Sequence, residues 1–169
     1  MKVNIFWFRR DLRLDDNAAL YYALISEHPV IPVFVFDNEI LDKLENKKDS
    51  RVTFIHDSLL EMQDKLTKLG SSLLVLNATP DKAFKELVKE YDIVNVFTNR
   101  DYEPYATERD ENIAELLKQH NIAFHLYKDH VILEQKEVVK DDGKPYTVFT
   151  PYSKKWKAAL TDYQFKSYP

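Results

Sequence analysis

The chain contains no cysteine among its 169 residues and only two glycines, Gly70 and Gly143. The lack of cysteine excludes a disulfide scaffold, a thiolate metal site and a thiol nucleophile. The two glycines lie too far apart for a GxGxxG motif or a P-loop, so a bound nucleotide must be held without a glycine-rich phosphate cradle. No apolar run approaches the roughly 20 residues of a membrane helix, and the opening MKVNIFWFRR is unlike a signal peptide. We therefore expect a soluble, cytoplasmic protein with no membrane partner.

Common catalytic and metal-binding motifs are also missing. The five histidines show neither HxxxH nor HExxH spacing, and the chain has no GxSxG nucleophile elbow. We therefore predict no metal site and no hydrolase-type nucleophile.

The composition is that of one globular domain. Hydrophobic residues make up 44% and charged residues 31% of the chain, and the formal net charge is −4. A chain of this length can bury a sizeable core, and its apolar content excludes a disordered or collagen-like protein. Residues 151–169 carry four lysines and one aspartate, a net charge of +3. Beside an acidic body, this small basic cluster favours a solvated face over a DNA contact.

Five short runs, rich in aromatic and β-branched residues, predict β-strands. Runs that are apolar throughout are typical of a parallel sheet covered on both faces. We expect strands at residues 3–8, 30–36, 73–76, 93–97 and 123–127.

Amphipathic patterns between these runs predict helices. Either Asp15 or Asp16 is suited to cap the first helix, and Thr79 is suited to cap a helix that has proline at its first position. Thr107 and Asp110 have the spacing of a capping box, with aspartate in place of the usual glutamate. We expect helices at residues 17–26, 50–69, 80–88 and 107–119.

The alternation of strands and helices, without an internal repeat, predicts an α/β fold. Its form would be a doubly wound, mostly parallel five-stranded sheet with helices on both faces, which is a Rossmann-like arrangement. Ligands of such sheets bind outside the carboxyl ends of the strands, near the point where the strand order reverses. The loops expected at this edge are residues 9–16, 37–38, 77–79, 98–105 and 128–130.

One of these loops contains the types of side chain that bind a planar polar ligand. Thr98–Tyr105 offers carboxylates, an arginine and two tyrosines directly after a strand. Tyrosine rings can stack on a flat ligand, and carboxylates can accept hydrogen bonds from its N–H groups. By themselves, Asp37 and Asn38 are also typical of a turn, and Arg51 is typical of a surface arginine. The nearly balanced charges of residues 9–17 favour an ion-paired helix cap over an anion site.

The rhythm of strands and helices stops after Val131. A turn is expected at residues 140–145, an aromatic stretch at 146–152 and a short helix at 153–160. We therefore divide the chain into an α/β domain at residues 1–130 and the start of a linker at residues 131–169.

Four segments together resemble the DNA photolyase/cryptochrome family. They occur in the order and spacing of that family and span essentially the whole chain. The segments are FWFRRDLRLDDN (6–17), RVTFIHDSL (51–59), NRDYEPY (99–105) and YTVFTPY (146–152).

The resemblance implies that residues 1–130 form the N-terminal domain of the family, which binds a light-harvesting antenna chromophore. It implies a longer protein, because nothing here resembles the family's C-terminal helical domain, which binds FAD. The complete photolyase would flip a cyclobutane pyrimidine dimer out of DNA and split it by light-driven electron transfer from FAD. The implied partners are damaged DNA and the C-terminal helical domain, and this chain is expected to supply no catalytic residue.

The loop after the fourth strand bears on the type of antenna. Family members that bind methenyltetrahydrofolate have an Asn-Glu pair two and three residues after the loop glutamate, where this chain has Tyr105 and Ala106. The resemblance therefore favours a deazaflavin or flavin. Asp101 would accept a hydrogen bond from the N–H edge of the flat ring system, and Arg51 would bind a phenolate oxygen. The residues implied to bind the chromophore are Phe36, Asp37, Asn38, Arg51, Asp101, Glu103 and Tyr105.

Two other functions stay open from the sequence. The chain could be the same domain of a cryptochrome, in which light changes the binding of a partner. It could also be a stand-alone nucleotide-binding protein, although the lack of glycine-rich loops counts against this. We further expect the isolated domain to self-associate through apolar surface at Tyr146–Tyr152 and Trp156.

Overall fold

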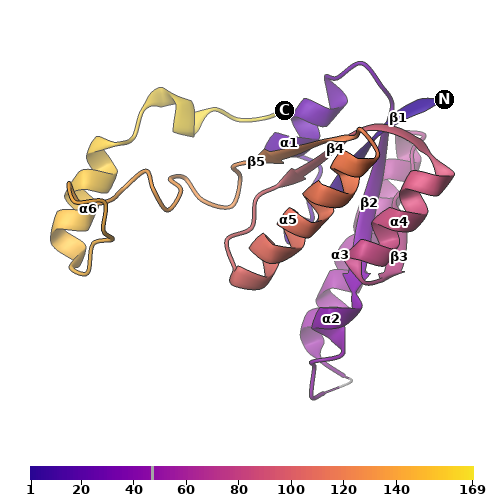
Figure 1. Ribbon diagram of the computed structural model, residues 1–169, viewed down its shortest axis with the longest axis horizontal. Helices are drawn as coiled ribbons and strands as arrows, with labels where there is room; N and C mark the ends of the chain where they lie inside the picture. The colour runs from indigo at the N-terminus through magenta and orange to yellow at the C-terminus, as the bar shows by residue number, and fades with distance from the viewer. Residues whose placement is uncertain (47) are drawn as a thin grey trace.

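One sheet of five parallel strands is the centre of the computed structural model, which describes residues 1–46 and 48–169. The strands lie in the order β3-β2-β1-β4-β5, and every neighbouring pair is parallel (Figure 1). The strands are β1 (Lys2–Phe8), β2 (Val30–Asp37), β3 (Leu74–Ala78), β4 (Asp92–Asn99) and β5 (Ala123–Tyr127). The prediction of a parallel five-stranded sheet is confirmed.

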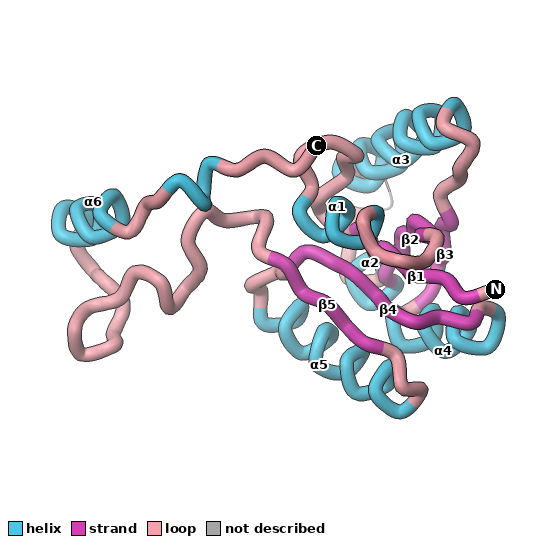
Figure 2. Tube along the Cα trace, turned by 90° about the horizontal axis from the view of Figure 1, so that it is seen from above, coloured by secondary structure: helices cyan, strands magenta, loops and turns pink. Residues whose placement is uncertain are grey.

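Helices cover both faces of this sheet. Figure 2 shows α1 and α3 on one side and α4 and α5 on the other, as a doubly wound fold requires. The helices are α1 (Ala18–Leu24), α2 (Asn38–Leu41), α3 (Ser50–Lys68), α4 (Pro80–Glu90), α5 (Pro104–Gln119) and α6 (Phe149–Ala158), with a final 3₁₀ turn, η1 (Asp162–Phe165). In the described part of the chain, no helix combines the length and the apolar character that crossing a membrane requires.

The central strand β1 supplies both halves of the core, because successive side chains of a strand point to opposite faces. Ile5 and Trp7 belong to the cluster that packs beneath α4 and α5. Phe6 and Phe8 belong to the cluster beneath α1 and α3. Full burial of such side chains contributes roughly 1.5–3 kcal/mol each. The alternation in one strand therefore holds the two helical layers together.

Two predicted helix caps are wrong. Asn17, and neither of the aspartates before it, caps α1, because its side-chain oxygen accepts a hydrogen bond from the backbone N–H of Leu20 at 3.2 Å. Helix α5 begins at Pro104, three residues before the predicted start, so Thr107 lies within its first turn. Asp110 is therefore not part of a capping box. It is buried and pairs with Arg9 from the loop after β1.

Other helix ends agree with the sequence chemistry. Thr79 caps α4, and its hydroxyl accepts a hydrogen bond from the backbone N–H of Lys82 at 3.4 Å. Gly70 has a φ of +76° directly after the C-cap of α3. This left-handed backbone is the conformation in which glycine carries no steric penalty. The helix α2 was not predicted, because its four residues are too few to show a helical period.

The segment after β5 leaves the sheet. Residues 128–148 form turns and bends without a helix or strand. Helix α6 starts at Phe149, four residues before the predicted start, and Pro151 lies in its first turn, where the missing N–H leaves no hydrogen bond unmade. In Figures 1 and 2, α6 lies well away from the sheet. The division between a domain and a linker remains a prediction.

The C-terminal end returns to the α/β domain at α1 (Figure 1). The backbone N–H of Tyr168 donates a 2.9 Å hydrogen bond to the carboxylate of Asp16. The Tyr168 ring also lies 5.6 Å from the ring of Tyr21. Residues 128–167 therefore leave the sheet after β5, and Tyr168 returns the chain to the residues at α1.

Candidate functional site

A cavity of about 230 Å³ opens at the carboxyl ends of β1, β2 and β4. The chain passes from β1 to β2 on one side, whereas β4 joins β1 on the other side. The strand order therefore reverses between β1 and β4, and the cavity lies where ligands of doubly wound sheets bind.

Five of the seven predicted site residues line this cavity. Phe36 and Asp37 come from the end of β2, Asp101 and Glu103 come from the segment between β4 and α5, and Tyr105 comes from the first turn of α5. They meet because parallel strands bring their carboxyl ends to the same edge of the sheet. The rest of the lining is mainly apolar and comprises Trp7, Phe34, Val35, Ile40, Leu41, Ile55, Pro80 and Ala106, together with Arg9, Arg10 and Arg109.

Asp37 and Tyr105 are in direct contact in the cavity wall. The phenol of Tyr105 donates a 2.5 Å hydrogen bond to Oδ2 of Asp37. The other oxygen of Asp37 accepts a 3.0 Å hydrogen bond from the backbone N–H of Glu39 and so caps α2. Burial, followed by the hydrogen bond and negative charge of Asp37, raises the pKa of Tyr105 above its ordinary value. The phenol is therefore a protonated donor at neutral pH.

A second acidic group lies opposite, on the segment after β4. Asp101 is buried, and one of its oxygens accepts a 2.8 Å hydrogen bond from the backbone N–H of Tyr102. Its other oxygen lies 3.3 Å from Nε of Arg10, whose terminal nitrogen lies 2.6 Å from the exposed carboxylate of Glu103. The hydrogen bond to Glu103 raises the pKa of Arg10. This ion-paired group adds polar side chains to a mainly apolar lining.

The inner wall of the cavity carries an indole beside two guanidinium groups. Trp7 is 2% exposed, and the guanidinium carbons of Arg9 and Arg109 each lie 5.0 Å from its ring centroid. Nη1 of Arg9 donates to both carboxylate oxygens of Asp110, at 2.6 and 2.8 Å, and Arg109 lies 3.1 Å from the same carboxylate. Burial lowers the pKa of Arg9, although Asp110 opposes that effect.

Two predicted site residues do not line the cavity. Arg51 is 74% exposed and lies 2.6 Å from Asp49, the N-cap of its own helix, which is the nearest carboxylate along the chain. It stands one turn before Ile55, which does line the cavity. Asn38 begins α2 and is not among the residues that line the cavity. The structure thus places Arg51 outside the cavity lining.

The sequence prediction missed five polar or aromatic wall residues, which are Trp7, Arg9, Arg10, Phe34 and Arg109. Arg109 follows Tyr105 by four residues, so the two side chains share one face of α5. That spacing could have identified Arg109. Arg10 and Trp7 adjoin the end of β1, and nothing in their local pattern separated them from the structural residues beside them.

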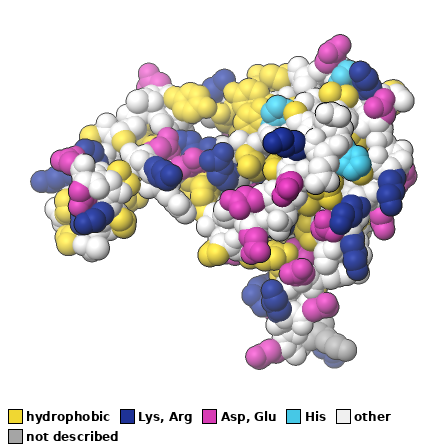
Figure 3. Space-filling view, in the orientation of Figure 1, with side chains coloured by type: hydrophobic (Ala, Val, Ile, Leu, Met, Phe, Trp, Pro, Cys, Tyr) yellow, Lys and Arg dark blue, Asp and Glu magenta, His cyan; other side chains and the backbone are white. Residues whose placement is uncertain are grey.

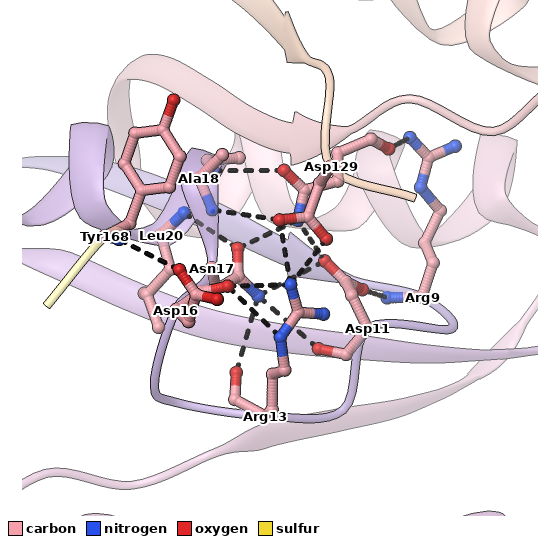
Figure 4. Close-up of polar contacts among 11 residues, drawn as sticks. Arg9, Asp11, Arg13, Asp16, Asn17, Ala18, Leu20, Asp129 and Tyr168 are labelled. Atoms are coloured by element: carbon pink, nitrogen blue, oxygen red, sulfur yellow. Dashed lines mark hydrogen bonds and ion pairs between the residues drawn. The ribbon is translucent and has the colours of Figure 1, made fainter. Parts of the chain in front are cut away.

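The predicted ion-paired role of the loop after β1 is confirmed, as Figure 4 shows. Asp11 accepts hydrogen bonds from the backbone N–H of Arg9 at 2.8 Å and from the side-chain amide of Asn99 at 2.6 Å. Arg13 lies 2.8 Å from Asp129, which also accepts a hydrogen bond from the backbone N–H of Ala18. These contacts join the loop after β1 to the ends of β4 and β5. The loop therefore holds the sheet edge in position beside the cavity.

The lining suits one flat heteroaromatic ring system. Its wall is mainly apolar, and buried carboxylates and arginines can hydrogen-bond to N–H and carbonyl groups at the edge of a ring. A volume of about 230 Å³ lies below the roughly 300–1,000 Å³ of sites that enclose a drug-sized ligand. A larger ligand whose flat ring system occupies this cavity would therefore extend beyond its mouth with the rest of its atoms.

Comparison with known proteins identifies relatives of the chain. The family model for DNA photolyase matches residues 4–169. A deoxyribodipyrimidine photo-lyase of a Synechococcus species is 32% identical over 91% of this chain and 32% of its own length. The deoxyribodipyrimidine photo-lyase of Halobacterium salinarum is 31% identical over 92% of this chain and 34% of its own length. The chain thus spans about a third of the length of these relatives.

Solved structures agree with this assignment. An archaeal photolyase from Sulfolobus tokodaii, described as having two FAD molecules, matches with a TM-score of 0.77 and 34% identity. The match covers 90% of this chain and 34% of that one. A class III photolyase from Agrobacterium tumefaciens matches with a TM-score of 0.79 and 28% identity, over 92% of this chain and 31% of that one. The chain belongs to the DNA photolyase family.

Proposed function

We propose that this chain is the antenna-binding N-terminal domain of a deoxyribodipyrimidine photolyase and that its antenna is a flavin or deazaflavin. The observation that carries the proposal is the cavity at the strand-order reversal, where five of the predicted chromophore residues meet. The Sulfolobus tokodaii photolyase supports a flavin, because it is described as having two FAD molecules and as implying a novel light-harvesting cofactor.

Each polar side chain has a distinct part in holding the ring. Asp101 would accept a hydrogen bond from the N–H edge, because its carboxylate is buried and still has a lone pair beyond its bonds to Tyr102 and Arg10. Tyr105 and Phe36 would border the ring with their aromatic surfaces. Arg51 would contact only the part of the ligand outside the mouth. When bound, the chromophore supplies absorption of light.

In the complete protein, a domain outside this chain would carry out the repair reaction. We propose that a C-terminal helical domain binds FAD and the damaged DNA and that it splits cyclobutane pyrimidine dimers by electron transfer from the flavin. The chain described here supplies excitation energy and no catalytic residue.

A cryptochrome is the alternative for the whole protein. Cryptochrome-1 of Drosophila melanogaster is 34% identical over 83% of this chain, so this domain alone fits both classes. A repair assay on dimer-containing DNA with the full-length protein separates them, because only a photolyase would restore the pyrimidines in light. The third possibility, a nucleotide-binding protein unrelated to photolyases, loses its basis with the family assignment.

Binding measurements on the domain test the proposal. Titration with a deazaflavin, with FMN and with methenyltetrahydrofolate should give a red-shifted, sharpened absorption band for one of the first two. Asp101→Asn should weaken that binding by about tenfold or more, since loss of a charge-assisted hydrogen bond costs about 1.5–3 kcal/mol. Asp81→Asn, on the exposed surface of α4, is the matched control. Equal affinity of both variants would remove Asp101 from the site, and binding of the folate alone would overturn the chromophore assignment.

A further inference from the structure

Trp7 has a chemical property that a light-harvesting site must control. Its indole lines the cavity and packs edge-on against Phe84 at a ring distance of 4.9 Å. Indoles are readily oxidised, and an excited flavin is a strong oxidant. A ring bound in this cavity would lie beside an electron donor.

Electron transfer from this donor would destroy the excitation. One electron would move from the indole to the excited ring, which leaves a positive charge on Trp7. The electron would then return, so that no atom is transferred and the absorbed energy becomes heat. A site that passes energy onward requires this first transfer to be slow.

The surroundings of Trp7 oppose a positive charge on its ring. The guanidinium carbons of Arg9 and Arg109 each lie 5.0 Å from the ring centroid, at a distance where cations interact with aromatic faces. Asp110 pairs with both guanidiniums, so the three groups together carry a net charge of +1. The guanidinium groups stabilise the neutral, electron-rich ring and repel the charge that oxidation would create. Their side chains are 6% and 10% exposed, so water screens this repulsion only weakly.

We propose that Arg9 and Arg109 suppress quenching of the bound chromophore by Trp7. The inference rests on the proposed function and adds to it a photophysical role for two residues of the wall. Arg109 serves as the test position, because Arg9 also donates hydrogen bonds to Thr98 and to the backbone carbonyl of Asn99 and thus holds the sheet edge.

Tyr105 is a second oxidisable ring in the lining, with a different environment. Lys43 and Arg109 lie 5.4 and 5.9 Å from its ring centroid. Its phenol, however, is hydrogen-bonded to Asp37, which can take the proton when an electron leaves. Tyr105 therefore retains a route to oxidation, and Tyr105→Phe is the background in which Trp7 is tested alone.

The experiment measures the fluorescence lifetime of FMN, and of a deazaflavin, bound to the Tyr105→Phe protein. Removal of one cation in Arg109→Gln should shorten the lifetime of the bound probe by about twofold or more. Arg109→Lys, which keeps the charge, should stay close to the parent. Adding Trp7→Phe to Arg109→Gln should restore the long lifetime. Free and bound probe give separate lifetime components. A change in affinity alters the proportions of these components and does not shorten the lifetime of the bound one.

Other outcomes would overturn the inference. An unchanged lifetime in Arg109→Gln, or a short one that persists without Trp7, shows that the guanidiniums do not control the indole. If Arg109→Gln does not fold, Trp7→Phe in the same background decides, because a marked lengthening there would show that Trp7 quenches despite its cations. If neither probe binds the wild-type protein in equilibrium dialysis, the proposed function fails and the inference falls with it.

Discussion

The phenol of Tyr105 and the carboxylate of Asp37 form a 2.5 Å hydrogen bond that joins the first turn of α5 to the end of β2. Asp37 also caps α2. One carboxylate therefore fixes the position of two helices that border the cavity. The shape of the cavity depends on this pair as well as on the sheet.

The first prediction concerns that hydrogen bond. Tyr105→Phe should lower the free energy of unfolding by about 1 kcal/mol, because a part-buried hydrogen bond is lost and Asp37 keeps only its bond to a backbone N–H. Urea unfolding measures the change. Tyr152→Phe, on α6 and outside the cavity, should change stability by less than about 0.5 kcal/mol. An equal decrease in the free energy of unfolding of both variants would show that the hydrogen bond between Tyr105 and Asp37 does not stabilise the fold.

The second prediction compares a buried ion pair with an exposed one. Asp110→Asn should lower the free energy of unfolding by about 3–5 kcal/mol, because it leaves the buried guanidinium of Arg9 without its counter-charge. Asp81→Asn breaks the pair with Lys85, in which both side chains are more than half exposed, and should cost less than about 1 kcal/mol. Chemical denaturation of both variants gives the comparison. A small effect of Asp110→Asn would mean that water reaches Arg9.

The third prediction is a pH dependence at the start of α3. Hydrogen bonds from the side chain and the backbone N–H of Arg51 hold the pKa of Asp49 at about 2, below its ordinary 3.8. A depressed carboxyl pKa favours the folded state above the ordinary value, and this contribution is lost as the pH falls from about 4 toward 2. In Arg51→Gln the pKa should rise toward 3.8. A carboxyl NMR titration tests this, and an Asp49 that already titrates near 3.8 in the parent would contradict it.

The fourth prediction concerns self-association, which remains a proposal. Hydrophobic side chains are exposed along residues 128–167, an arm that carries α6 (Figure 3). Phe149 and Phe165 in this arm are 78% and 71% exposed. Replacement of both by serine should shift sedimentation profiles at high concentration toward the monomer, because less apolar surface is available for contact. Phe54→Ser removes a phenylalanine that is 72% exposed on α3, outside the arm, and serves as the control. A monomeric parent protein would disprove the proposal.

The sheet could be predicted from the sequence because its signals are local. Continuous apolar runs such as Val3–Phe8 are long enough to identify buried strands, and their alternation with helices determines the topology. The cavity edge follows from the same topology, so Asp37 and Asp101 could be placed together before any contact was known.

The predictions that differ from the structure concern side chains that have several possible partners. Arg51 pairs with Asp49 of its own helix start, and a long exposed side chain has no pattern in the sequence that reveals this choice. Asp110 looked like a cap by spacing, yet Arg9, a hundred residues earlier, binds it in the interior. Contacts of this kind depend on tertiary structure, and only a helical-face argument, from Tyr105 to Arg109, could have recovered part of the wall.

The central position of β1 has a consequence for how the chain folds during synthesis. The residues of β1 are translated before those of the other four strands, yet Asn4–Phe6 pair with residues 95–97 of β4. A strand at the edge of the sheet could pair with one neighbour, whereas β1 stays open on one side until about a hundred residues have been translated. Parallel pairing over such distances is slow, and unpaired apolar strands aggregate. The nascent chain therefore exposes one edge of β1 until β4 has been translated, which favours binding by chaperones that recognise extended apolar segments.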